Sequence, residues 1–220
     1  MPNTIASSAI RIFLIRHGET DWNRVHRFQG RTDVPLSQEG RQQAQALALA
    51  LKHEPLMAIY SSPLTRAMET ARLIKNFHPT IDLFEETGLI EMDLGKFEGM
   101  KARHWAEQYP DFREKWQENP ASVKIPEGES LPEVQTRAIE ALERITRSYP
   151  PESTLLISSH NFVIGAILCY ASGKSLNRFR DFRQGTAALN VLYNQNGRWR
   201  TEVVNERTHL HKYSDTYLQH

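Results

Sequence analysis

The chain has 220 residues, of which 40% are hydrophobic and 24% charged, and its formal net charge at pH 7 is +1. This length favours one α/β domain over residues 1–220, with an insertion. The near-zero charge argues against a nucleic-acid binder, and no apolar run approaches the ~20 residues needed to cross a bilayer. The lone cysteine, Cys169, and the lack of a targeting segment predict a cytoplasmic protein without membrane partners.

Strand and helix signals alternate through the first part of the chain. Residues 10–16 form a nearly continuous apolar run, which predicts a strand covered on both faces. Ser37 is placed to cap a helix, and residues 56–60 predict a second strand. Ser62 and Pro63 predict the start of the next helix, with Ser as N-cap and Pro in the first helical position.

The stretch 95–126 differs in character. It is polar, rich in tryptophan and charge, and interrupted by prolines, so we expect an insertion of two short helices that lies over the core as a lid. After it, Ser130 and Glu133 form a capping-box pattern, which predicts a helix that runs to about Ser148.

The remaining elements define the fold class. Residues 154–159 predict a third core strand and residues 161–171 a helix directly after it. Residues 186–193 and 199–204 predict two late strands joined by a turn. This order predicts an α/β fold with a mostly parallel central sheet, flanked by helices on both faces.

Three residues stand where ligands collect in such folds, near the carboxyl ends of strands or the starts of helices, and a fourth, Glu91, comes just before the polar insertion. His17 ends the first strand, preceded by Arg16, whose guanidinium matches phosphate oxygens. His160 ends the strand 154–159. Arg66 lies in the first turn of its helix, and Glu91 follows an apolar pair. Each of these residues would be unremarkable alone.

Their sequence context carries more information, because many short motifs occur together in one order. These are Leu14–Asn23, Gln29–Gly30, Pro35–Ser37, Gly40 with Gln43–Ala44, Tyr60–Ala67, Leu89–Glu91, Gly95, Phe97–Gly99, Gly128–Ser130 and Ser158–His160. In order and spacing they resemble the histidine phosphatase superfamily, also called the phosphoglycerate-mutase-like family. The resemblance spans roughly residues 11–193.

The resemblance implies a role for each site residue. His17 would attack phosphorus and form a phosphohistidine that water hydrolyses. Glu91 would protonate the leaving oxygen, which calls for a raised pKa. Positive charge and hydrogen bonds around the phosphoryl oxygens would come from Arg16, Arg66 and His160, and the wider phosphate-binding set adds Asn23, Gln29, Gly30 and Asn161. No metal and no cofactor is expected. His209 and His211 could form a chelating pair, but a polar tail is the favoured interpretation.

Three functions stay open on this resemblance. A phosphatase acting on a small phosphorylated metabolite is favoured, with homodimerisation possible. Cofactor-dependent phosphoglycerate mutases typically follow the acidic Glu with Arg-His-Tyr-Gly, whereas here Glu91 precedes Met92-Asp93-Leu94-Gly95, and the insertion is short. A non-catalytic or protein-directed phosphate-binding member is the third reading. Asn161 stands where the family often has Gly, which leaves the substrate open.

Overall fold

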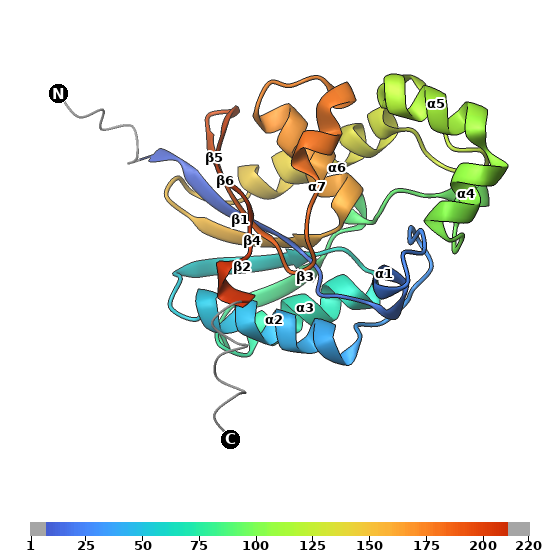
Figure 1. Ribbon diagram of the computed structural model, residues 1–220. Coiled ribbons are helices and arrows are strands. Elements are labelled where there is room, and N and C mark those ends of the chain that lie inside the picture. The colour runs from blue at the N-terminus through green and yellow to red at the C-terminus, as the bar shows by residue number, and fades with distance from the viewer. Residues whose placement is uncertain (1–7, 211–220) are drawn as a thin grey trace.

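The structure is a computed structural model that describes residues 8–210, and this part of the chain folds around a six-stranded sheet (Figure 1). The strands lie in the order β3-β2-β4-β1-β5-β6. The first four are parallel, whereas β5 and β6 pair antiparallel. The strands are β1 (Ile10–Arg16), β2 (Leu56–Ser61), β3 (Asp82–Glu85), β4 (Thr154–Ser159), β5 (Leu189–Gln195) and β6 (Arg198–Glu206). The predicted mostly parallel sheet is confirmed.

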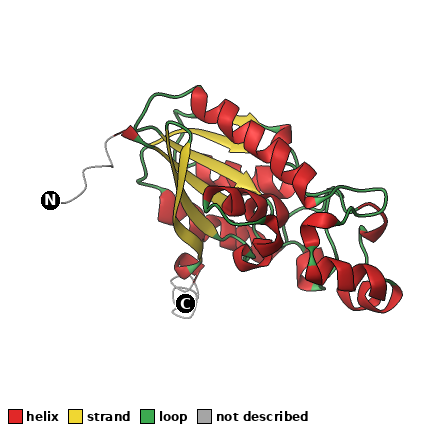
Figure 2. Cartoon of the chain, turned by 90° about the horizontal axis from the view of Figure 1, so that it is seen from above, coloured by secondary structure: helices red, strands yellow, loops and turns green. Residues whose placement is uncertain are grey.

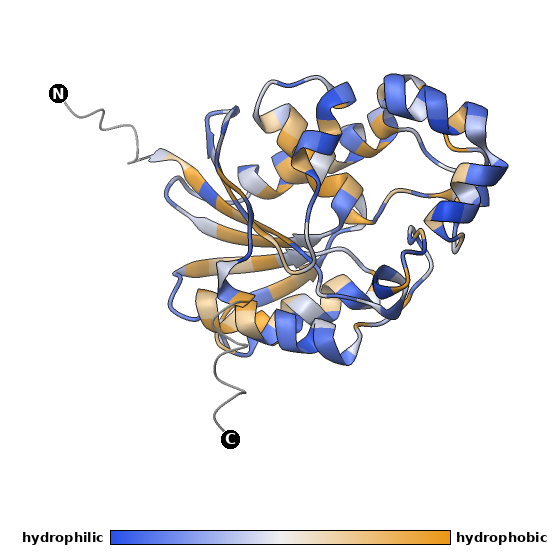
Figure 3. Cartoon of the chain, in the orientation of Figure 1, coloured by the Kyte–Doolittle hydropathy of each residue, from blue (hydrophilic) through white to orange (hydrophobic). Residues whose placement is uncertain are grey.

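Helices cover both faces of this sheet, as the sequence predicts. On one face lie α2 (Gln38–Leu51) and α3 (Thr65–Lys75), and on the other α6 (Leu131–Arg147) and α7 (Asn161–Ala171). Alternate residues of β1 serve the two sides, because successive side chains of a strand point to opposite faces. Phe13 and Ile15 belong to the core with α2 and α3, and Ile12 and Leu14 to the core with α6 and α7. Figure 3 shows the apolar residues gathered along the strands between the helices.

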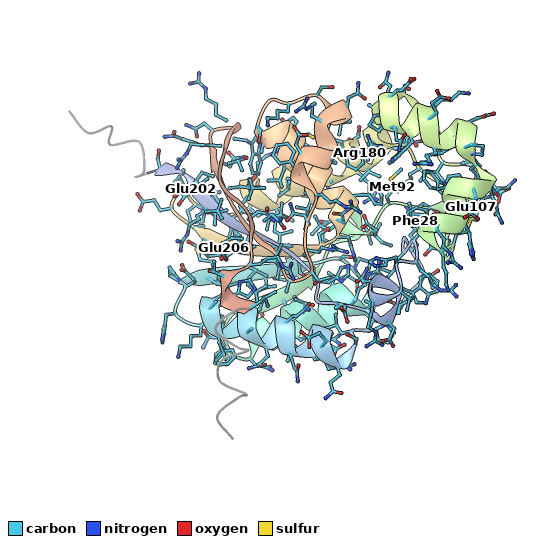
Figure 4. The ribbon with its side chains drawn as sticks, in the orientation of Figure 1. Phe28, Met92, Glu107, Arg180, Glu202 and Glu206 are labelled. Atoms are coloured by element: carbon cyan, nitrogen blue, oxygen red, sulfur yellow. The ribbon has the colours of Figure 1, made fainter. Side chains whose placement is uncertain are left out.

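The predicted lid consists of α4 (Ala102–Gln108) and α5 (Pro110–Glu118), which project beyond one end of the sheet (Figure 2). Short 3₁₀ turns flank it, over Gly95–Phe97 and Pro120–Ser122. Arg180, labelled in Figure 4, donates to the carbonyls of Trp116 at 2.6 Å and Gln117 at 3.1 Å. These bonds tie the end of α5 to the 3₁₀ segment Leu176–Phe182.

The start of α3 corrects one prediction. The helix begins at Thr65, not at Ser62-Pro63, and its N-cap residue Leu64 makes no side-chain cap bond. Asp33 from a distant loop takes that role, since its carboxylate accepts from the Thr65 N–H at 2.7 Å and the Thr65 hydroxyl at 2.6 Å. The Ser62 hydroxyl instead lies 2.7 Å from the His160 ring.

Other boundaries also differ from the sequence prediction. The first late strand begins at Leu189, three residues after Thr186, because the intervening loop bonds to the site: the Ala187 N–H donates to the His17 carbonyl at 3.0 Å. Short elements that the sequence analysis left out are β3, α1 (Asp21–Arg24) and the 3₁₀ turn Thr87–Leu89. Within residues 8–210 no helix is long and apolar enough to cross a membrane.

Candidate active site

The parallel strands bring the predicted residues to one edge of the sheet. Arg16 at the end of β1 pairs in register with Ser159 at the end of β4, and Ser61 at the end of β2 pairs with Ser158. The residues that follow, His17 and His160 among them, therefore emerge side by side. The His17 N–H donates to the Ser159 carbonyl at 3.2 Å and fixes this arrangement.

His17 has one ring nitrogen held and the other left as a base. Its side chain is nearly buried, and Nδ1 lies 2.7 Å from the Gly18 carbonyl oxygen. Because a carbonyl can only accept, Nδ1 must carry the proton, and Nε2 keeps its lone pair. Burial, reinforced by the charges of Arg66 and Arg16, lowers the pKa of His17 well below its ordinary value. The ring is therefore neutral at physiological pH.

His160 lies against this ring, with the two ring centroids 5.1 Å apart. Its Nε2 is 2.7 Å from the Ser62 hydroxyl, and its Nδ1 is buried without a hydrogen-bond partner in the described part of the chain. Burial first, and then the charge of Arg66, lowers the pKa of His160 well below its ordinary value. A buried unpaired ring nitrogen at this edge suits contact with a ligand.

Arg66 is fully buried and is held by a neighbouring loop. Its guanidinium donates to the carbonyls of Gly30 at 2.7 Å and Thr32 at 3.0 Å. With its amide oxygen facing the guanidinium, Gln29 accepts from Arg66 Nε at 3.2 Å, while its amide nitrogen donates to Thr20 at 2.6 Å. Burial lowers the pKa of Arg66 to about 10, so the side chain stays charged at neutral pH.

Glu98 holds the same loop from the other side, a role that the sequence analysis did not assign. Its carboxylate accepts from the backbone N–H groups of Gly30 at 2.9 Å, Arg31 at 3.3 Å and Thr32 at 3.3 Å. Both backbone polar groups of Gly30 are thus engaged, which leaves its predicted phosphate contact without a free donor. The Phe97-Glu98-Gly99 motif could have pointed to Glu98, but no local signal shows what it binds.

Arg16 lies in the site with one terminal nitrogen hydrogen-bonded and its Nε without a partner in the described chain. One terminal nitrogen donates to the Gln184 carbonyl at 2.6 Å, whereas Nε is buried and finds no partner among residues 8–210. Burial lowers the pKa of Arg16 to about 10, opposed by the nearby Glu91 and assisted by Arg66. Two protonated guanidiniums thus lie close to the neutral His17 ring.

Glu91 is buried, with 4% of its surface exposed. Its two carboxyl oxygens accept from the backbone N–H groups of Met92 at 2.9 Å and Phe162 at 3.4 Å. Burial raises the pKa of Glu91, and the Met92 bond and Arg66 oppose this only in part. Arg137, which Glu129 holds at 2.9 and 3.0 Å, donates to the Glu91 carbonyl at 3.2 Å and fixes its backbone.

A cavity of about 360 Å³ opens over these groups, between the strand ends and the lid. The predicted residues that line it are Arg16, Asn23, Gln29, Glu91 and Asn161. His17, Arg66 and His160 are almost fully buried. The charge of Arg16, which lines the cavity, acts electrostatically on both histidines. The Asn23 side-chain oxygen accepts from the Thr20 N–H at 3.1 Å. The structure thus brings all predicted site residues into one neighbourhood.

No cluster of three or more metal-ligating side chains occurs in the described range 8–210. His209 lies 3.4 Å from Glu206, and His211, its partner in the rejected chelating pair, lies outside the described residues. Burial lowers the pKa of His209, and the Glu206 contact opposes the shift.

Known proteins are similar to this chain in sequence and in fold. The chain is 34% identical over 201 residues to phosphoserine phosphatase 1 of Hydrogenobacter thermophilus, which covers 91% of this chain and 94% of that one. It is 30% identical to a metal-independent phosphoserine phosphatase of Arabidopsis thaliana, over 94% of this chain and 85% of that one. The solved structure of Bacillus stearothermophilus YhfR superposes with a TM-score of 0.85 at 28% identity, covering 91% and 99% of the two chains.

Proteins named as mutases are also similar to this chain. Escherichia coli O1:K1 has a probable phosphoglycerate mutase GpmB that is 30% identical over 86% of this chain and 87% of its own. The family model described as histidine phosphatase superfamily (branch 1) matches residues 12–207. The chain therefore belongs to the histidine phosphatase superfamily, branch 1, and is an enzyme of the phosphatase type, as its motifs predict.

Proposed function

We propose that this protein hydrolyses small phosphomonoesters without a metal ion, in two steps, through a phosphohistidine at His17. The hydrogen bond from His17 Nδ1 to the Gly18 carbonyl carries the proposal, because it leaves Nε2 as a neutral nucleophile beside two guanidiniums. Positive charge near the nucleophile both suppresses its protonation and attracts the phosphoryl group.

In the first step, His17 Nε2 attacks phosphorus and the bond from phosphorus to the ester oxygen breaks. The proton held by Glu91 passes to the departing oxygen, so an alcohol leaves rather than an alkoxide. The raised pKa of Glu91 keeps that proton available near neutral pH. Arg16, Arg66 and the His160 ring stabilise the charge on the equatorial phosphoryl oxygens.

In the second step, water attacks the phosphohistidine. The Glu91 carboxylate takes a proton from that water, the bond between phosphorus and nitrogen breaks, and inorganic phosphate leaves. His17 returns to its neutral form and Glu91 to its protonated form, which closes the cycle. Phosphate release requires that the cavity admits water while the intermediate is present.

The residues after Glu91 favour hydrolysis over mutase chemistry. Met92 is fully buried in the core, and Asp93 pairs with Arg31 at 3.3 Å and accepts from the Gly95 N–H at 2.9 Å. Neither side chain is free to bind the carboxylate of a phosphoglycerate, which the family resemblance assigns to the Arg-His-Tyr-Gly motif of mutases. The phosphoserine phosphatases among the relatives support a small phosphorylated metabolite as substrate. Cytoplasmic location and homodimer formation stay predictions.

Phosphate release from a panel of phosphomonoesters in EDTA tests this function. The panel contains an aryl phosphate, sugar phosphates, O-phosphoserine and 3-phosphoglycerate, with His17→Ala beside the wild type. The exposed histidine variant His53→Ala is the matched control. We expect turnover that survives chelation, is retained in His53→Ala and is lost in His17→Ala. Isomerisation of 3-phosphoglycerate without phosphate release would assign a mutase instead, and binding without turnover a non-catalytic or protein-directed member.

A further inference from the structure

A second cavity of about 350 Å³ adjoins the catalytic one beneath α4 and α5. Aromatic rings from the lid and the body form much of its wall, including Trp105, Phe112, Trp116 and Phe179. Phe28, labelled in Figure 4, lines both cavities. Asn161 and Arg183 also line both. These two polar side chains therefore stand where a leaving group would pass from the phosphoryl site toward the aromatic cavity.

Arg183 differs from its basic neighbours in having a side chain with no partner among residues 8–210. Arg180 donates to backbone carbonyls of α5, and Arg178 pairs with Asp181 at 2.8 Å. The exposed Arg183 guanidinium makes no hydrogen bond or ion pair with any side chain or backbone group of residues 8–210. Its charge nevertheless reaches the site, because it contributes to the lowered pKa of Arg16.

Within residues 8–210, neither acidic side chain of the catalytic cavity pairs with Arg183. Glu19 accepts from the Ser37 hydroxyl at 3.0 Å, and Glu91 accepts from the backbone of Met92. Burial raises the pKa of Glu91, which favours its uncharged form. The cationic Arg183 is therefore available to an anion that enters with the substrate.

Asn161 supplies a second donor at the same place. Its side-chain oxygen accepts from the Gln184 N–H at 3.0 Å, which fixes the orientation of the amide. The amide nitrogen has no partner within the described chain and carries two N–H donors. A charged guanidinium and an amide nitrogen that line the same two cavities match the two oxygens of a carboxylate.

We propose that Arg183 and Asn161 form a specificity subsite for a carboxylate on the leaving group. The protein would then select phosphate esters of hydroxy acids or hydroxy amino acids. This proposal rests on the proposed phosphatase function and deepens it. Arg183 and Asn161 act as specificity-determining residues and take no part in the two steps above. For Asn161 this role replaces the phosphate contact that the family resemblance implies.

Matched substrate pairs test the subsite. O-phosphoserine is compared with O-phosphoethanolamine, and 3-phosphoglycerate with glycerol 3-phosphate, because the members of each pair differ in the carboxylate. An aryl phosphate without a second charge reports the chemistry alone. We measure kcat/KM for the wild type, for Arg183→Ala and for the control Arg178→Ala. Arg178 lies in the 3₁₀ segment Leu176–Phe182 that directly precedes Arg183, and it lines neither cavity.

We expect the wild type to prefer the carboxylate member of each pair. Arg183→Ala should lower kcat/KM for that member by about 10- to 100-fold, the range for a lost hydrogen bond to a charged group. The member without a carboxylate and the aryl phosphate should change less than about 3-fold, and Arg178→Ala should behave as wild type. Because Arg183 is exposed, Tm should not change.

Two results would overturn the subsite while leaving the phosphatase intact. One is an equal loss for both members of a pair, which would mean that Arg183 serves phosphate charge in general. The other is an unchanged preference in Arg183→Ala while the aryl phosphate is still hydrolysed. If the wild type hydrolyses no ester, the aryl phosphate included, the proposed function itself fails and the subsite fails with it.

Discussion

Replacement of Glu91 by Gln removes the proton that Glu91 gives in the first step and the base that it supplies in the second, so proton donation is tested on the first step alone. Gln keeps the shape of the side chain, and its oxygen can still accept from the Met92 N–H that holds Glu91 at 2.9 Å, whereas the longer bond from the Phe162 N–H, at 3.4 Å, is lost. It cannot donate a proton to a leaving alkoxide. General acid catalysis contributes about 10²- to 10⁴-fold, so Glu91→Gln should lose about 3 to 5 kcal/mol of transition-state stabilisation for an alkyl phosphate.

The size of the loss should depend on the leaving group. A nitrophenolate departs without a proton, so its release in the first step should be nearly unaffected by Glu91→Gln. An alkoxide needs the proton, and its release should show the full loss. Single-turnover rates with nitrophenyl phosphate and O-phosphoserine measure this contrast, with the exposed Glu107→Gln of the lid (Figure 4) as control. A loss of the same size for both leaving groups would refute proton donation by Glu91.

The pH profile provides a second readout of the same variant. Turnover needs His17 neutral and Glu91 protonated, and the lowered pKa of His17 and raised pKa of Glu91 open that window from both sides. As pH rises through the raised pKa of Glu91, kcat/KM for alkyl esters should fall. The Glu91→Gln profile should lack this alkaline limb, since Gln does not titrate. An alkaline limb that persists unchanged in the variant would assign it to another group.

Three further changes test the framework around the site. Because the folded-state pKa of Glu91 is raised, its contribution to stability is present in acid and is lost as pH rises through that pKa. At alkaline pH the Tm of Glu91→Gln should therefore exceed that of the wild type, and equal Tm values at every pH would contradict this. Glu98→Ala removes the acceptor that holds the Arg66 loop, and kcat/KM should fall by about 10- to 100-fold while Tm drops slightly; unchanged kinetics would show that Arg66 is held without it. In Gly40→Ala the added Cβ would meet the Glu19 carbonyl oxygen at 1.9 Å, so urea unfolding should show a loss of about 1 to 3 kcal/mol, and full stability would mean that the loop yields freely.

The sequence predicts the layers of this fold because their signals are local. The apolar run 10–16 indicates a strand buried on both faces, and the structure shows alternate side chains of β1 packed on opposite helices. The Ser37 cap and the Ser130 capping box are confirmed where predicted. The predicted start of α3 was wrong, because the carboxylate of Asp33, from a distant loop, caps the helix in place of the local Ser62-Pro63 signal.

The site residues also differ in whether the sequence could place them. His17 and His160 could be placed from sequence because parallel strands that end together bring their next residues together. Glu98 could not, because its role depends on a loop that lies far away along the chain. The proposed role of Arg183 could not either, because it depends on where two cavities meet in the folded chain. Gly30 illustrates the limit: its motif marks the site, but only the structure shows that its carbonyl holds Arg66.

Trapping the phosphoenzyme tests the covalent step at His17 most directly. The wild type and His17→Ala are mixed with an aryl phosphate whose phosphoryl group carries the label. The reaction is quenched within one turnover in alkali, which preserves phosphohistidine, and the protein is digested for mass spectrometry. We predict label on the peptide that contains His17, lost on acid treatment, formed no more slowly than phosphate appears, and absent in His17→Ala. Label on another residue, or phosphate release by His17→Ala at the wild-type rate without any labelled intermediate, would contradict nucleophilic catalysis by His17.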